Sequence, residues 1–265
     1  PEEALTRTEH AQPALFAVSY ALWMVFEEES GLAPAGAVGH SLGEYTALTA
    51  AGAFDYETAL SVVGLRGRAM ARAADIEPSG MAALIGADRD LAEDVSENRR
   101  QAGGRLQVAN VNAPGQVVVA GGRDDIDWLA DNAGDLGLRR VVPLGVAGAF
   151  HSEFMASARA ALTERLETVT IGEPAFPVWS NTTGKPHEPG SIAGLLGRQM
   201  VEPVLFAGCL TDMSESGIDS FIHVGPGDVT AGLARRTLDG VSTHIISNAG
   251  DIPSVIGAVG TMGRS

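Results

Sequence analysis

The sequence is nearly devoid of cysteine. Cys209 is the only cysteine among 265 residues, so no disulfide can form within the chain and a reducing compartment, the cytoplasm, is expected. A single thiol also excludes a thiolate metal cluster. The six histidines include no His-x-x-x-His pair, so we expect no metal site.

Positive charge is scarce as well. The chain has 18 Lys and Arg against 33 Asp and Glu, and Lys185 is its single lysine. A net charge of −15 argues against a general surface for nucleic acid or for an anionic membrane. An acidic partner protein would therefore have to find a local cluster of arginines.

Long apolar runs are absent. The best candidate, residues 14–26, is too short to cross a bilayer and is followed by three glutamates at 27–29. A buried helix is the better interpretation, and the acidic beginning of the sequence does not resemble a secretory signal. The apolar fraction of 45% is ordinary for a globular protein, and the length predicts one large domain or a domain with a subdomain.

The strongest motif is the stretch Gly-His-Ser-Leu-Gly-Glu-Tyr at residues 39–45. A short apolar run at 35–38 predicts a strand before it, and residues 44–51 predict a helix after it. Strand, tight turn and helix form the setting of a Gly-x-Ser-x-Gly nucleophile elbow, whose glycines let strand and helix approach closely. Ser41 would then be exposed at a helix N-terminus, where backbone N–H groups favour negative charge.

Strands and helices alternate compactly between residues 78 and 146. The expected elements are a strand at 81–86, a helix at 90–101, strands at 106–112 and 116–120, a helix at 124–136 and a strand at 139–144. This β-α-β-β-α-β order is the ferredoxin-like pattern. We predict a small subdomain at 78–146, inserted into a larger one made of residues 1–77 and 147–265.

The rest of the chain predicts helices joined by short strands. Helices are expected at 11–29, 55–74, 153–166, 190–200, 203–217 and 229–238, and strands at 177–180, 220–224 and 243–246. The glycine-rich tail after residue 250 is expected to be peripheral.

Four motifs in this order resemble one family. They are Gly39-His-Ser-Leu-Gly-Glu44, Arg66-Gly67, Gly148-Ala-Phe-His151 and Gly225-Pro-Gly227. The sequence is thereby similar to the malonyl-CoA:acyl-carrier-protein transacylases, which include the acyltransferase domains of polyketide synthases. The resemblance implies an α/β fold: an α/β-hydrolase-like core with a parallel sheet and an inserted ferredoxin-like subdomain. The family pattern also opens with a strand and a Gly-Gln-Gly turn, which this sequence does not contain, so a core strand and the second oxyanion donor stay unassigned.

The resemblance also implies the chemistry. Ser41 is the expected nucleophile and His151 its base, oriented by a backbone carbonyl at Gln199 instead of an acidic third member. The Leu42 N–H is the available oxyanion donor. Arg66 has a planar guanidinium that can bind a carboxylate through two hydrogen bonds. A malonyl group has a free carboxylate and an acetyl group does not. A limb near the ordinary pKa of imidazole is expected in the pH–rate profile.

Further residues bear on specificity, where they match family positions, and on docking, where a local cluster of arginines is needed. Phe150 is expected to wall the space beside the malonyl α-carbon, and Asn110, Asn112 and Asn181 either line the site or are turn and strand-end residues. Arg198, Arg235 and Arg236 are candidates for docking an acidic carrier protein, although Arg235 and Arg236 could equally form a solvated helix face.

The implied reaction is ping-pong transfer of malonyl from malonyl-CoA to the phosphopantetheine thiol of an acyl carrier protein, in polyketide or fatty acid biosynthesis. No bound cofactor is needed, and adjacent synthase domains are possible partners. Two alternatives stay open. A serine esterase or thioesterase would share the elbow and the histidine but would not need Arg66 near Ser41, and a non-catalytic interaction domain would need neither.

Overall fold

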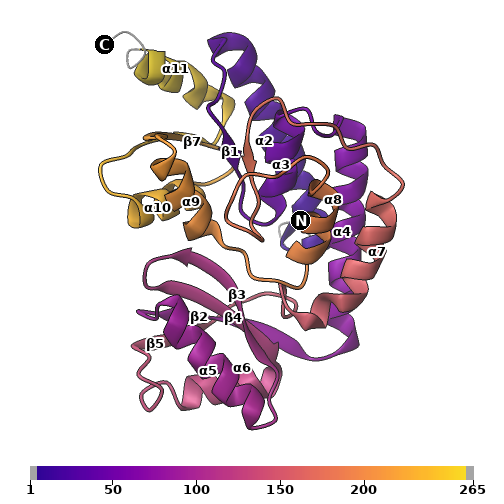
Figure 1. The fold of residues 1–265 in the computed structure, drawn as a ribbon, viewed down its shortest axis with the longest axis vertical. Helices are drawn as coiled ribbons and strands as arrows, with labels where there is room; N and C mark the ends of the chain where they lie inside the picture. Colours follow the sequence, from indigo (N-terminus) through magenta and orange to yellow (C-terminus); the bar gives the residue numbers. More distant parts are fainter. Residues whose placement is uncertain (1–4, 261–265) are drawn as a thin grey trace.

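The computed structural model describes residues 5–260 as a mixed α/β protein (Figure 1). In its first half the elements are α2 (Thr8–Ser30), β1 (Ala37–Val38), α3 (Leu42–Ala50), α4 (Tyr56–Ile76), β2 (Ser79–Ile85), α5 (Arg89–Gln101), β3 (Leu106–Ala113), β4 (Gln116–Gly122), α6 (Arg123–Asp131) and β5 (Arg140–Pro143). They are followed by η1 (Glu153–Met155), α7 (Ala156–Leu166), β6 (Val178–Trp179), α8 (Ile192–Gln199), α9 (Phe206–Glu215), β7 (Ser220–Val224), α10 (Val229–Thr237), β8 (Ser242–Ile246), η2 (Ala249–Asp251) and α11 (Ile252–Gly260).

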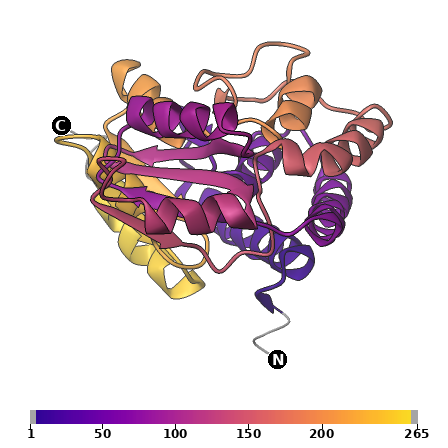
Figure 2. The same ribbon diagram turned by 90° about the horizontal axis from the view of Figure 1, so that it is seen from below.

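Residues 79–143, here called the four-stranded unit, form the lower part of the molecule in Figure 1. Its strands lie in the order β3-β4-β2-β5, and every neighbouring pair is antiparallel. Figure 2, seen from below, shows α5 and α6 lying across the sheet. Helix α6 ends at Asp131, earlier than the sequence predicted, and the segment up to the strand forms turns around Gly134 and Gly137.

The two faces of this sheet bury different surfaces, as the two-residue period of a strand requires. Ala82 and Leu84 of β2 pack with the apolar residues of α5 and α6. Their neighbours Met81 and Ala83 point to the opposite face, where they pack with Phe150. One face of the unit therefore closes its own core, and the other covers the segment that carries His151.

The remainder of the chain, called the large part, is built around a helical core. Helices α2, α4 and α7 pack together around Phe16, Tyr45 and Leu162, all of which are fully buried. No helix within residues 5–260 is both long and apolar enough to cross a membrane.

Short parallel strands complete the large part. Strand β1 pairs with β6, and β7 pairs with β8. The C-terminal segment differs from the sequence prediction, because α11 is a packed helix and not a peripheral tail. Ile252 and Val255 lie on one face of α11 and are buried against Leu22 and Phe26 of α2.

Strand β3 joins the two parts. The Val111 N–H donates to the Val204 carbonyl at 2.8 Å, and the Val204 N–H donates to the Ala109 carbonyl at 2.9 Å. This parallel bridge interrupts the regular register of β3 with β4, which shifts between Val108 and Asn110. The strand thus carries its polar side chains to the junction where the site lies.

Candidate active site

Ser41 occupies a sharp turn between β1 and α3. Its backbone has φ 51° and ψ −100°, a conformation that residues other than glycine rarely adopt. Gly39 is required here, because a Cβ at that position would lie 1.9 Å from the Gly43 carbonyl carbon. Gly43 itself faces open space, so the close approach of strand and helix depends on the first glycine of the motif alone.

Ser41 and His151 form a hydrogen-bonded pair. Ser41 Oγ lies 2.8 Å from His151 Nε2, and His151 Nδ1 lies 2.8 Å from the Gln199 carbonyl oxygen. A carbonyl can only accept, so Nδ1 carries the proton and Nε2 is left to accept from the hydroxyl. The ring is held in the tautomer that a general base needs, with a backbone carbonyl in the place of an acid.

The surroundings of His151 keep the imidazole neutral. Burial and the nearby positive charge of Arg66 lower the pKa of His151 to about 3, although its bond to the Gln199 carbonyl acts in the opposite direction. This lowered pKa argues against the expected titration near the ordinary imidazole value. An uncharged Nε2 is available to accept a proton throughout the neutral range.

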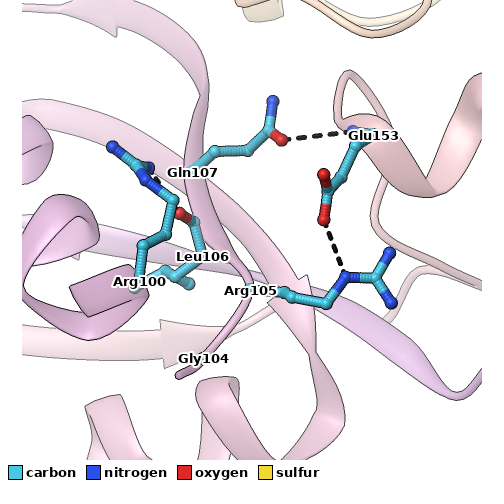
Figure 3. Close-up of a pocket in the computed structure, with 6 residues that line it drawn as sticks. All are labelled: Arg100, Gly104, Arg105, Leu106, Gln107 and Glu153. Carbon is cyan, nitrogen blue, oxygen red and sulfur yellow. Dashed lines mark hydrogen bonds and ion pairs between the residues drawn. The ribbon is translucent and has the colours of Figure 1, made fainter. Parts of the chain in front are cut away.

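His151 is also strained, with φ 57°. The Gln107 side chain, from β3, contacts both sides of this turn. Its Nε2 lies 3.4 Å from the His151 carbonyl oxygen and 3.3 Å from that of Val201, and its Oε1 accepts from the Glu153 N–H at 3.1 Å. Arg105 also forms an ion pair with Glu153 (Figure 3).

Arg66 is the largest fully buried side chain of the molecule's core. Its Nη2 donates to Ser41 Oγ at 2.9 Å and to Gln199 Oε1 at 3.0 Å, and its Nη1 donates to Gln12 Oε1 at 2.6 Å. Burial lowers the pKa of this guanidinium, and Tyr45, whose ring centroid lies 5.4 Å away, offsets part of that.

The contacts of Arg66 are all neutral, and Nε lies buried without a partner. Among the described residues, no carboxylate forms an ion pair with it. The negative charge of Glu44 offsets part of the burial, but the neutral Gln199 amide lies between it and the guanidinium. A buried cation that touches no carboxylate is costly, and a bound carboxylate would supply a direct ionic partner. The geometry therefore brings an anion-accepting group to the nucleophile.

Asn181 lies beneath the elbow and does not line an open space. Its Oδ1 accepts from the Ser41 N–H at 2.6 Å and its Nδ2 donates to the Gly39 carbonyl at 2.8 Å. These bonds occupy its fully buried amide. Since the Ser41 N–H is engaged, Leu42 at the first position of α3 is the next amide that helix geometry leaves without an intrahelical acceptor.

The other predicted residues lie at the junction of the two parts. Asn112 Oδ1 lies 2.7 Å from Nε2 of His40, and burial lowers the pKa of His40. Asn110 is buried where β3 bridges to Val204. Phe150, half-buried, packs against both the helical core and the sheet.

The three docking candidates are not gathered in one place. Arg198 forms a two-fold contact with Glu202, with both distances 2.8 Å, so its charge is already compensated. Arg235 bonds Thr243 and Arg236 bonds Gln116 of β4, both through neutral oxygens.

Four residues around the site were not predicted, and two of them, Gln12 and Glu44, are buried. Gln12 and Gln107 have no local signal, because their partners are 54 and 44 residues away in the sequence. Glu44 belongs to the elbow motif, but its partner His187 lies 143 residues further on.

A serine hydroxyl hydrogen-bonded to a neutral histidine, on a mixed α/β fold, is typical of enzymes that pass acyl groups through a serine ester. Comparison with known proteins narrows that class. The family model described as "Acyl transferase domain" matches residues 1–263, and the chain belongs to this family. It is an acyltransferase.

Individual relatives agree with this assignment. The malonyl CoA-acyl carrier protein transacylase of Bacillus subtilis (strain 168) is 36% identical over 247 residues, which cover 93% of this chain and 78% of that protein. The polyketide biosynthesis protein PksE of the same organism is 37% identical over 235 residues, covering 88% of this chain but 30% of that protein. The solved complex PlMCAT:AntF (holo), a type II PKS acyl-carrier protein with its malonyl-transacylase, superposes with TM-score 0.93 at 34% identity, covering 97% of this chain and 84% of that one.

Proposed function

We propose that this chain transfers a malonyl group from malonyl-CoA to the phosphopantetheine thiol of an acyl carrier protein, through a malonyl ester on Ser41. The observation that carries the proposal is the position of Arg66, whose Nη2 lies 2.9 Å from Ser41 Oγ. Malonyl presents a free carboxylate beside its thioester, and a guanidinium next to the nucleophile is the group that would hold it. The transacylases similar to this chain act on the same two substrates.

In the first half-reaction, Ser41 Oγ attacks the thioester carbonyl while His151 Nε2 accepts the hydroxyl proton. The Leu42 N–H donates to the oxyanion of the tetrahedral intermediate. Collapse of this intermediate breaks the C–S bond, and the imidazolium gives its proton to the leaving CoA thiolate. A malonyl ester on Ser41 and a neutral His151 remain.

The second half-reaction reverses these steps with a different thiol. The phosphopantetheine thiol of the carrier gives its proton to His151 Nε2 and attacks the ester carbonyl. The C–O bond to Ser41 then breaks, and the serine oxygen recovers the proton from His151. The Gln199 carbonyl accepts from Nδ1 throughout, so the ring does not need to turn between the two half-reactions.

A hydrolytic esterase is the alternative reaction class for the same pair of residues. It needs no cation at the nucleophile, and burying Arg66 without a counter-ion would then serve no purpose. Arg66 therefore favours malonyl transfer over general ester hydrolysis, and the bonded Ser41–His151 pair favours an enzyme over an interaction domain.

The test uses intact-protein mass spectrometry after brief exposure to malonyl-CoA. Wild type should gain one malonyl group on the peptide containing Ser41 and lose it on addition of holo carrier protein, with malonyl-carrier as the product. Ser41→Ala should gain nothing and should keep its melting temperature. Arg66→Ala should lose malonyl transfer relative to acetyl transfer by a factor of about 30 to 1,000, since a sheltered charged pair contributes about 2–4 kcal/mol. Release of free malonate with no malonyl-carrier would contradict the proposal.

We also infer the finer architecture. The β-α-β-β-α-β order and all-antiparallel pairing of the four-stranded unit support a ferredoxin-like subdomain with boundaries near 78–146. The elbow between β1 and α3 supports an α/β-hydrolase-like core made of residues 1–77 and 147–265. The reaction would take place in the cytoplasm, in fatty acid or polyketide synthesis, as a separate enzyme or beside other synthase domains.

A further inference from the structure

Glu44 is a buried carboxylate that the reaction above does not use. It lies on α3, three residues after the nucleophile, and has no exposed surface. Its Oε2 accepts from Gln199 Nε2 at 2.8 Å and from the Asn181 N–H at 3.0 Å. Its Oε1 accepts from His187 Nε2 at 2.8 Å. A buried carboxylate with three donors is fully satisfied, so its position is sharply defined.

The Gln199 amide lies between two opposite charges. Its NH₂ group donates to Glu44, and its carbonyl oxygen accepts from Arg66 Nη2 at 3.0 Å. Rotating the amide by half a turn would bring its oxygen against the carboxylate and its NH₂ against the guanidinium. Both contacts would be repulsive, because all three side chains are buried. The carboxylate of Glu44 thus fixes which way the amide faces.

This orientation reaches the reacting groups. The correctly turned amide gives Arg66 an acceptor, and its Nε2 also donates to the Ser41 carbonyl at 3.1 Å. The backbone carbonyl of the same Gln199 residue accepts from His151. Glu44 also accepts from the Asn181 N–H. Asn181 in turn bonds the Ser41 N–H and the Gly39 carbonyl, so Glu44 supports both sides of the elbow through it.

We propose that Glu44 is a positioning residue for the acyl-transfer site: its carboxylate sets the orientation of the Gln199 amide, which in turn holds Arg66 against Ser41. The effect on malonyl selection rests on the proposed function. The effect on the geometry of Ser41 does not depend on which acyl group is transferred.

Two variants separate the role of the acceptor from that of the charge. Glu44→Ala removes the acceptor, so the Gln199 amide is free to turn. Glu44→Gln keeps an oxygen facing Gln199 and Asn181 and turns its NH₂ toward His187. His187 would then accept at Nε2 and carry its proton on Nδ1, which is buried without a partner in this structure, so this variant should lose some stability. Because the oxygen that faces Gln199 is kept, the conservative variant should still rescue the site.

Two quantities measure the outcome. The first is the ratio of the rates at which malonyl-CoA and acetyl-CoA acylate Ser41. The second is the rate at which a fluorophosphonate probe labels Ser41, where the serine oxygen bonds phosphorus and fluoride leaves with the hydroxyl proton. Glu44→Ala should lower each by about tenfold or more, as expected for a lost buried acceptor, and Glu44→Gln should stay within about threefold of wild type.

Asp212→Asn is the matched control. Asp212 also accepts from two donors, Trp179 Nε1 at 2.7 Å and Lys185, and these donors lie in the segments next to Asn181 and His187. It contacts neither Gln199 nor Arg66. If the role of Glu44 were merely structural, Asp212→Asn and Glu44→Ala would lower stability and leave the malonyl-to-acetyl ratio unchanged, and that result would overturn the proposal.

Gln199→Met covers the case in which Glu44→Ala does not fold. Methionine has a similar shape, keeps the backbone carbonyl for His151 and lacks the amide. It should lower the malonyl-to-acetyl ratio about tenfold while probe labelling keeps its dependence on His151. An unchanged ratio in this variant would refute the link between Glu44 and Arg66. If wild type formed no malonyl ester on Ser41 while the probe results were as expected, only the proposed function would be contradicted.

Discussion

At the scale of the residue, the site depends on two side chains held in unfavourable backbone conformations. Ser41 and His151 are the two described non-glycine residues with positive φ, at 51° and 57°. Such conformations cost about 1–3 kcal/mol each and persist only where the surroundings determine them. Asn181 supports the first from both sides through the Ser41 N–H and the Gly39 carbonyl, and Gln107 contacts the second. The strain brings the two reacting atoms within 2.8 Å of each other.

The pKa of His151 gives a prediction about pH. Because this pKa is lowered to about 3, the free enzyme should keep its neutral base well below the ordinary imidazole range. The acid limb of kcat/KM for acetyl-CoA should therefore lie below pH 5, more than about 1.5 units under the ordinary value of about 6.5. Arg66→Ala removes one cause of the lowering, so its limb should move upward.

The measurement is kcat/KM for acetyl-CoA on wild type and Arg66→Ala from about pH 3.5 to 8, a range in which wild type should show no limb near the ordinary imidazole value of about 6.5. Acetyl-CoA is used because it has no carboxyl group that titrates. The sign also extends to folding. Between pH of about 6.5 and about 3, His151 is protonated in the unfolded chain and neutral in the folded chain. The free energy of unfolding should therefore fall as pH drops through this range. A kinetic limb at the ordinary imidazole value would contradict the argument.

Phe150 gives a prediction about the acyl group. It precedes His151 and packs between the helical core and the sheet, so Phe150→Ser should open space beside the α-carbon. Discrimination against methylmalonyl-CoA should fall by a factor of about 10, because one methyl group in an apolar pocket is worth about 1–3 kcal/mol. The measurement is the ratio of kcat/KM for malonyl- and methylmalonyl-CoA.

Phe154→Ser is the control for this substitution. Phe154 packs against the same two clusters but lies under Arg105, 3.9 Å from its guanidinium. Both variants should lower the melting temperature, and only Phe150→Ser should change the ratio. If wild type already uses methylmalonyl-CoA as well as malonyl-CoA, the steric interpretation of Phe150 is wrong.

At the scale of the element, much of the secondary structure follows from local signals. Helix α4 begins where the Asp55 side chain accepts from the Thr58 N–H, and Asp is a residue type preferred at this capping position. Helix α11 was missed because its glycines suggest a loop, while Ile252 and Val255, three apart, are buried against α2 and against Ile246 of β8. Composition cannot predict such a helix, since part of its stability comes from packing with residues more than 200 positions away.

The site divides in the same way. Ser41, His151 and Arg66 lie in short motifs that a reader can find in the sequence, and the structure brings them together. Glu44 and Gln107 act through side-chain contacts with residues at least 44 positions away in the sequence, which leave no local pattern. Asn181 was found by its position, but its contacts with the backbone of the elbow could not be inferred without the structure.

Strand β3 gives a prediction about the coupling of the two parts. Gln107→Leu would remove the contacts with the His151 and Val201 carbonyls and with the Glu153 N–H (Figure 3). A misplaced base should lower kcat by about tenfold and leave KM for malonyl-CoA within about twofold, because substrate binding does not use this side chain.

Arg100→Met serves as its control. Arg100 lines the pocket drawn in Figure 3 together with Gln107 and Glu153. It donates to the Leu106 carbonyl and to Glu97, so its contacts stay within the four-stranded unit. It should lower stability slightly and leave kcat unchanged. If Gln107→Leu retained full kcat, the sheet would be only a cover for the His151 segment and not part of what orients it.

At the scale of the whole molecule, an acidic enzyme has to meet an acidic carrier. Carrier docking should therefore depend on arginines whose charge is not already compensated. Arg235 and Arg236 are exposed in the last turn of α10, and Arg236 reaches Gln116 at the start of β4, so the pair lies beside the junction that contains the site. Arg198 is paired with Glu202 and should contribute less.

The test is the charge-reversed pair Arg235→Glu with Arg236→Glu, assayed with holo carrier protein at low salt. KM for the carrier should rise about tenfold, KM for malonyl-CoA should not change, and the difference should shrink as salt screens exposed charges. Arg72→Glu with Arg159→Glu is the matched control, because it makes the same change in net charge on α4 and α7, across the large part from α10 in Figure 1. Equal effects from the two pairs would mean that the carrier senses net charge alone. A response confined to α10 would identify this end of the molecule as the place where an acidic partner overcomes a net charge of −15.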